Sequence, residues 1–139
     1  MDETMLLSAA SRSTAGTLLL SIVAIEFGGT YLLSVLRGRH QKSDFQKAFA
    51  RAGHAHAGVL VTLCLVCQIL VDSTQMTGAA ALVARSGIPA AAVLMSAGFF
   101  LSSAGQDVTQ PNRLIVLLYA GVVSLGLGAV ALGIGLLTA

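Results

Sequence analysis

The residues best suited to chemistry are few, and they interrupt or border long apolar runs. Glu26 lies in the apolar segment IVAIEFGG, and His54 and His56 lie in ARAGHAHAG at the start of the next run. Ionisable groups inside a membrane span are costly, so their presence favours a functional role. Weaker polar candidates within such runs are Gln68, Ser96, Ser102 and Ser103.

The two histidines are expected to have different roles. Residues two apart on a helix point about 200° apart, so one regular helix cannot direct both rings at one metal ion. Four apolar side chains share a face with His56: Val59, Leu60, Leu63 and Cys67. Such a stripe could line a flat hydrophobic cofactor, and neutral imidazole is a common axial ligand of haem iron. In the alternative interpretation, both histidines are interfacial groups that hydrogen-bond backbone or water.

Glu26 and the two cysteines each allow a structural and a chemical interpretation. Glu26 is either a protonated, hydrogen-bonded acid that ties helices together, or a proton relay or partner of His54 or Arg51. Cys64 and Cys67 lie three residues apart within one apolar run. A redox-active Cys-x-x-Cys pair needs a helix N-terminus, so we expect two inert, buried thiols without a disulfide.

The composition indicates which elements must hold these residues. Hydrophobic residues make up 55% of the 139-residue chain and charged residues 10%, against roughly 25% charged in ordinary soluble domains. A soluble chain of this length could not bury so much apolar surface. We therefore predict an all-α integral membrane four-helix bundle, one transmembrane domain over residues 1–139. The expected spans, each near the roughly 20 residues that a bilayer requires, are 14–36, 49–71, 88–104 and 113–137.

The third span is the least regular, because the polar segment 85–87 and Pro89 interrupt it. Proline suits the first turn of a helix and damages its interior. We therefore place the start of this span near Ile88 and expect residues 79–84 to form a short turn or an extension of the loop. Small residues crowd the fourth span over 121–135, which predicts close helix contact within the bundle or between subunits.

The distribution of basic residues predicts an orientation. The loop 37–51 carries five of the eight Lys and Arg residues, and with Arg113 its side of the membrane holds six against two. Because Lys and Arg accumulate on the cytoplasmic side, we expect this loop at the cytoplasmic face of the inner membrane and both termini opposite. A net charge of +2, with the basic residues gathered in one loop, excludes nucleic acid as a partner.

Several short motifs occur in the order found in a known family. The segments AIEFGGTYLLSV, ARAGHAHAG, AGFFLSSAG and QPNR resemble those of the membrane-bound styrene oxide isomerases, small four-helix proteins that bind haem b. The resemblance extends over most of the chain. The match of AHAG to the family's Ala-His-Ser-Gly implies that His56 is the axial haem ligand. Phe100 and Thr62 stand where the family has an active-site tyrosine and asparagine.

The resemblance implies that ferric haem acts as a Lewis acid on an apolar aryl epoxide that arrives from the lipid bilayer. Rearrangement then gives an aldehyde without net redox. It also implies a homotrimer. The expected site has His56 as the metal ligand. Around the haem we expect His54, Leu60, Leu63 and Cys67, with His54 nearer the membrane boundary, bonded to a haem propionate, Glu26 or a backbone carbonyl. The expected catalytic positions are Glu26, Thr62 and Phe100.

Two other functions remain open. One is a haem protein for electron transfer, gas sensing or haem handling. The other is a haem-free subunit for transport or assembly. A haem Soret band would separate the haem-free function from the others.

Overall fold

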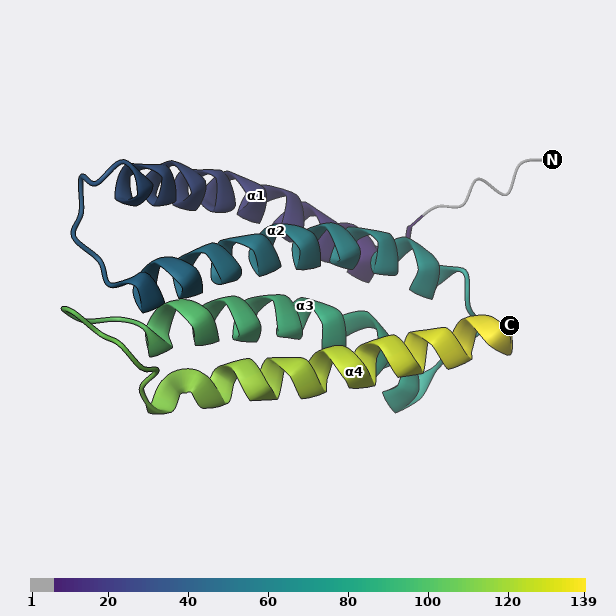
Figure 1. The fold of residues 1–139 in the computed structure, drawn as a ribbon. Helices are drawn as coiled ribbons and strands as arrows, with labels where there is room; N and C mark the ends of the chain where they lie inside the picture. Colours follow the sequence, from purple (N-terminus) through teal and green to yellow (C-terminus); the bar gives the residue numbers. More distant parts are fainter. Residues whose placement is uncertain (1–6) are drawn as a thin grey trace.

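The computed structural model describes residues 7–139 and forms an all-α four-helix bundle, without strands in that part of the chain (Figure 1). The helices are α1 (Ala9–Leu36), α2 (Asp44–Asp72), α3 (Gly78–Ser102) and α4 (Val116–Leu137), the last preceded by the short 3₁₀ helix η1 (Arg113–Ile115). With η1 and α4 taken together, each of the four is long and apolar enough to cross a membrane. The chain is a multi-pass membrane protein, as the sequence predicts.

Successive helices run antiparallel and pack mainly on their neighbours in sequence. α2 lies between α1 and α3, and α4 packs along α3 (Figure 1). The loops 37–43 and 103–112 lie at one end of the bundle, and the start of α1 and the carboxyl terminus lie at the other. The two segments that carry most of the basic residues therefore share one end, as the charge analysis requires.

A capping box starts α2. Ser43 Oγ accepts a hydrogen bond from Gln46 N at 3.1 Å, and Ser43 N donates to Gln46 Oε1 at 3.2 Å. The buried Gln46 side chain also donates from Nε2 to Ser103 O at 2.9 Å, so it holds the loop after α3. The helix begins at Asp44, ahead of the expected span 49–71, because this cap precedes the apolar stretch.

α3 is one helix that continues through Pro89, so the expected start of this span near Ile88 is wrong. The segment 79–84, expected to be a turn or loop, belongs to the helix. Pro89 has no N–H and cannot bond the carbonyl four residues earlier. Gln68 Nε2 of α2 donates to that carbonyl, Arg85 O, at 3.0 Å. A neighbouring helix thus supplies the donor that proline lacks, which allows proline inside a membrane helix.

Polar side chains join α1, α2 and α3 at the end that carries the chain termini. We call this group the end cluster: Ser8, Ser11, Gln68, Asp72 and Arg85. Arg85 Nη2 pairs with Asp72 Oδ1 at 2.8 Å, and Ser8 N donates to Asp72 Oδ2 at 2.8 Å. The fully buried Ser11 Oγ accepts from Arg85 Nη1 and donates to Gln68 O at 3.2 Å. The arginine that interrupts the third apolar run is therefore paired by the two preceding helices.

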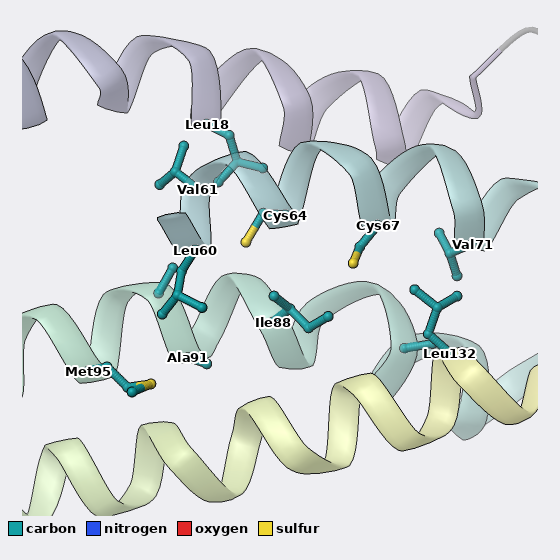
Figure 2. Packing of buried hydrophobic residues seen from close by; sticks show 12 residues of the cluster. Leu18, Leu60, Val61, Cys64, Cys67, Val71, Ile88, Ala91, Met95 and Leu132 are labelled. Atoms are coloured by element: carbon teal, nitrogen blue, oxygen red, sulfur yellow. The ribbon is translucent and has the colours of Figure 1, made fainter. Parts of the chain in front are cut away.

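The apolar core contains both cysteines (Figure 2). Cys64 is fully buried and Cys67 is 4% exposed, and both are free thiols in one cluster with Ile88 and Leu132. The prediction of two buried thiols without a disulfide is confirmed.

Glycines bring α3 and α4 into backbone contact. A Cβ added at Gly87 would lie 2.8 Å from Gly128 Cα, and one added at Gly98 would lie 2.5 Å from Leu118 N. Any larger residue at these positions would force the helices apart. On α4, Gly121, Gly128 and Gly135 serve packing within the chain, the first of the two uses that the sequence allows, whereas an added Cβ at Gly126 or Gly133 would meet nothing within 4 Å.

Candidate functional site

His54 and His56 contact different neighbours of α2. The His54 ring lies against α1, where a Cβ added at Gly29 would lie 3.1 Å from His54 Cε1. The His56 ring lies beside Phe99 of α3, with 5.0 Å between the ring centroids. The two imidazoles thus belong to two separate environments, in accord with the divergence expected from helical spacing.

The orientation of His56 is fixed by its own helix. Its Nδ1 lies 2.8 Å from Ala52 O, one turn earlier. A carbonyl oxygen can only accept, so Nδ1 carries the proton and donates. In the neutral ring the other nitrogen, Nε2, carries the lone pair, and it has no hydrogen-bond partner within residues 7–139. A histidine whose second nitrogen donates to a backbone carbonyl is in the form typical of metal ligands.

A row of aromatic rings leads along α2 to His56. Ring centroids are 4.2 Å apart for Phe45 and Phe49 and 5.4 Å apart for Phe49 and Phe99, and Phe99 then contacts His56. All of these residues are half-buried. Tilted and edge-on ring pairs at such distances are favourable. The three phenylalanine rings therefore support one another, and Phe99 packs directly against the His56 ring. Helical spacing places Phe49 two turns before His56, but Phe99 comes from another helix and only the fold brings it there.

The apolar stripe predicted around His56 is divided between core and surface. Leu60 is 5% and Cys67 4% exposed, whereas Val59 is 68% and Leu63 39% exposed. That these side chains line a cofactor stays a prediction, and the structure shows only that two of them lie in the core and two at the surface. These four side chains cover a strip of α2 that is wider than the contact between α2 and α3. Part of the strip is therefore buried in the bundle and part lies on its surface. Only the exposed pair can meet a group bound at His56 from outside.

Glu26 lies on the exposed side of α1. Within residues 7–139 it forms no ion pair or hydrogen bond with His54 or Arg51. The pairing of Glu26 with His54 or Arg51, one of the alternatives that the sequence left open, is therefore not formed among the described residues. Glu26 precedes Gly28 by two residues, which places the two about 200° apart around α1, so Glu26 does not share the face on which Gly28 borders His54.

The two positions that match the family's active-site residues lie apart from each other. Thr62 is exposed, and its Oγ1 donates to Gly58 O at 3.0 Å within α2. Phe100 lies on α3 with its ring edge against Gly53, where an added Cβ would lie 3.1 Å from Phe100 Cε2. Neither side chain offers a free hydroxyl or amide to a substrate.

A pocket of about 350 Å³ opens between α1, α2 and α3. Its lining includes Gly28 from α1, His54 from α2, and Pro89, Ser96 and Phe100 from α3. His56 is not part of the lining. Of the residues predicted for the site, the fold thus brings His54 and Phe100 together in this pocket and leaves the others outside it. The sequence pointed to Ser96 only as a weaker polar candidate within an apolar run, and nothing in the spacing along one helix indicated that it lines a pocket together with His54.

The described residues 7–139 contain no group of three or more His, Cys, Asp or Glu side chains that could hold a metal ion. A bare ion such as zinc needs three or four protein ligands, whereas haem brings four of its own and needs one or two from the protein. A single free imidazole nitrogen therefore fits haem better than a bare ion. Comparisons of the chain with protein-family models, curated proteins and solved structures found no match.

Proposed function

We propose that this chain is a haem b-dependent membrane isomerase that rearranges an apolar aryl epoxide to an aldehyde. The observation that carries the proposal is the anchored imidazole of His56, with Nδ1 at 2.8 Å from Ala52 O and Nε2 free. The resemblance of its segment, ARAGHAHAG, to the haem-binding segment of the styrene oxide isomerases supports the same residue.

The surroundings of His56 suit a flat apolar group. The Phe99 ring lies on one side of the imidazole, and the exposed side chains of Val59 and Leu63 follow at one and two turns along α2. His56 would hold haem through Nε2. Leu60 and Cys67 support this face from inside the core and do not reach its surface.

When bound, ferric haem supplies Lewis acidity that polarises the oxygen of an epoxide. The chain would position the substrate and exclude water from it. Val59, Leu63 and Phe99 present hydrocarbon and an aromatic ring, which keep water from the reacting carbons and so prevent hydrolysis to a diol. The Thr62 hydroxyl already donates to Gly58 O, so substrate orientation must rest on apolar packing. No proton donor or acceptor of the chain is needed, since the rearrangement is internal to the substrate.

We further propose that the protein is a homo-oligomer, a trimer, in the inner membrane with the loop 37–51 in the cytoplasm. The resemblance of the sequence segments to those of the styrene oxide isomerases supports the trimer. The shared end of the basic segments 37–51 and Arg113 supports the orientation.

The test is a visible spectrum of the detergent-purified protein from cells supplied with a haem precursor, followed by turnover of styrene oxide to phenylacetaldehyde without an electron donor. We expect a Soret band and turnover. Protein without a Soret band overturns the proposal in favour of a haem-free transport or assembly role. A Soret band without turnover also overturns the isomerase and favours a haem protein for electron transfer, sensing or haem handling.

A further inference from the structure

We infer that the pocket lined by His54 and Ser96 is a binding site in its own right, for a small lipid-soluble molecule that carries one hydroxyl group. We call it the His54 pocket. Its volume of about 350 Å³ lies at the lower end of the range for small-molecule sites. The inference does not depend on haem at His56, because His56 does not line this pocket.

The walls of the His54 pocket are hydrocarbon, and its mouth faces the membrane interior. Apolar side chains from all three helices line it: Leu18, Ile25, Val61, Ala92 and Val93. Val93 lies near the middle of α3 and is 69% exposed. A molecule dissolved in the lipid could therefore enter sideways between α1 and α3 without crossing water. These features select an apolar ligand.

Two polar side chains in the pocket lack hydrogen-bond partners among residues 7–139, and they favour a ligand that carries a hydroxyl group. Ser96 Oγ is buried and makes no hydrogen bond within residues 7–139. His54 also has no hydrogen-bond partner in this part of the chain. By contrast, the other two hydroxyls of the lining are occupied: Thr17 Oγ1 donates to Ser13 O at 3.0 Å and Ser21 Oγ donates to Leu18 O at 2.7 Å.

An unpartnered hydroxyl in hydrocarbon is costly, since neither lipid nor an apolar ligand can satisfy it. A ligand hydroxyl can accept a hydrogen bond from Ser96 and donate one to a neutral ring nitrogen of His54. A lipid acyl chain would fill the same volume and leave both groups unsatisfied. The chemistry of the pocket therefore fits an apolar alcohol or phenol better than a hydrocarbon chain.

The pocket is preformed on the α1 side. The His54 ring lies on the backbone of α1 at two glycines, with added Cβ atoms 3.9 Å away at Gly28 and 3.1 Å away at Gly29. Only the absence of a side chain at position 29 leaves room for the ring there. His54 is therefore held by shape before any ligand arrives, which lowers the entropy lost on binding.

The experiment uses 2-naphthol as the probe and naphthalene, which lacks the hydroxyl, as its control. The protein contains no tryptophan, so naphthol fluorescence can be followed without overlap. With the protein in lipid nanodiscs, we expect saturable binding of one 2-naphthol per chain above the partition into empty nanodiscs. The same binding is expected of the haem-free variant His56→Ala, which separates this site from the proposed function.

Matched variants locate the binding. Ala57 lines the pocket, and Ala55, two residues earlier, is exposed and does not. Ala57→Leu should abolish saturable binding, and Ala55→Leu should bind like the parent. Ser96→Ala should weaken 2-naphthol binding about fivefold, the loss expected for one hydrogen bond, without changing naphthalene binding.

Three results would overturn the inference. The first is binding that never saturates above empty nanodiscs. The second is equal binding of naphthalene and 2-naphthol, which would make the pocket a groove for acyl chains. The third is unchanged binding in Ala57→Leu, provided that its circular dichroism and gel-filtration profile match those of the parent.

Discussion

The two sides of α2 hold their imidazoles by different means. His56 is held by a hydrogen bond from Nδ1 to Ala52 O within one helix. His54 makes no hydrogen bond in the described part of the chain and is held by contact with the glycine backbone of α1. The hydrogen bond of His56 fixes the direction of the lone pair on its other nitrogen, as binding to a metal requires. The packing contact of His54 fixes the position of the ring but not its hydrogen bonds. A ligand hydroxyl, which can both donate and accept, suits His54 for that reason.

The two sites also differ in what they depend on. The anchor of His56 needs only the helical backbone of α2, and its aromatic neighbours are partly on the same helix. The His54 pocket needs three helices at their present distances, including α3 with its proline. Changes that disturb helix packing should therefore affect the pocket first, and changes to His56 should leave the pocket intact.

The largest expected effect is the loss of haem on changing His56. His56→Ala should abolish the Soret band and any isomerase activity, because no second imidazole points to the same place. His54→Ala should retain the band. Visible spectra of the two purified variants, with haem measured per chain, provide the test. If His54→Ala lost haem and His56→Ala kept it, the assignment of roles to the two sides of α2 would be reversed.

A smaller effect is expected where α3 depends on α2. Gln68→Met conserves the volume of the buried side chain but removes the donor to Arg85 O, so the carbonyl freed by Pro89 becomes unsatisfied. The expected loss of stability is about 1 to 2 kcal/mol, the cost of such a group. Denaturation in detergent measures it. 2-Naphthol binding should weaken while haem retention is unchanged; equal loss of both would show that the two sites are not separable.

The glycines of α1 provide a finer comparison. At position 29 an added methyl would lie 3.1 Å from His54 Cε1, closer than most such contacts, whereas at position 28 the nearest atom is 3.9 Å away. Gly29→Ala should displace the ring and weaken 2-naphthol binding several-fold. Gly16→Ala, also on α1 but outside the pocket lining and with nothing within 4 Å of an added methyl, should bind normally and gain about 1 kcal/mol in helix stability. Equal 2-naphthol binding by the two variants would contradict the proposed packing of the His54 ring against Gly29.

The smallest effect is expected at Glu26, which lies exposed on α1 without a partner among residues 7–139. Glu26→Gln should preserve the fold, haem retention and 2-naphthol binding, because no contact is lost. Gel filtration and the two binding assays check this. A failure to assemble, rescued by Glu26→Asp, would instead reveal a carboxylate contact with another chain.

Composition and hydrophobic run length were sufficient to predict four membrane helices, because the bilayer requires long apolar segments whatever their partners. They failed at α3 for a specific reason. The polar residues 85–87 and Pro89 look like a break when the segment is considered alone. In the fold, Gln68 bonds the free carbonyl and Asp72 pairs the arginine, and both partners come from another helix.

The candidate site shows the same limit. Helical periodicity correctly separates His54 from His56, since that is a property of one helix. It could not divide the stripe around His56 into buried Leu60 and exposed Val59, because the division depends on where α3 touches α2. Nor could it place Ser96 in a pocket with His54, residues that lie 42 positions apart on different helices.

The end cluster bears on the order in which the helices enter the membrane. An arginine within a membrane helix opposes insertion, and α3 carries Arg85 in its third turn. All of its side-chain partners, Asp72 on α2 and the two serines at the start of α1, precede it in the chain. During synthesis they are made first. The hairpin of α1 and α2 is therefore complete before α3 is synthesised. Its Asp72 can pair with Arg85 as α3 enters the membrane, which lowers the cost of inserting that arginine.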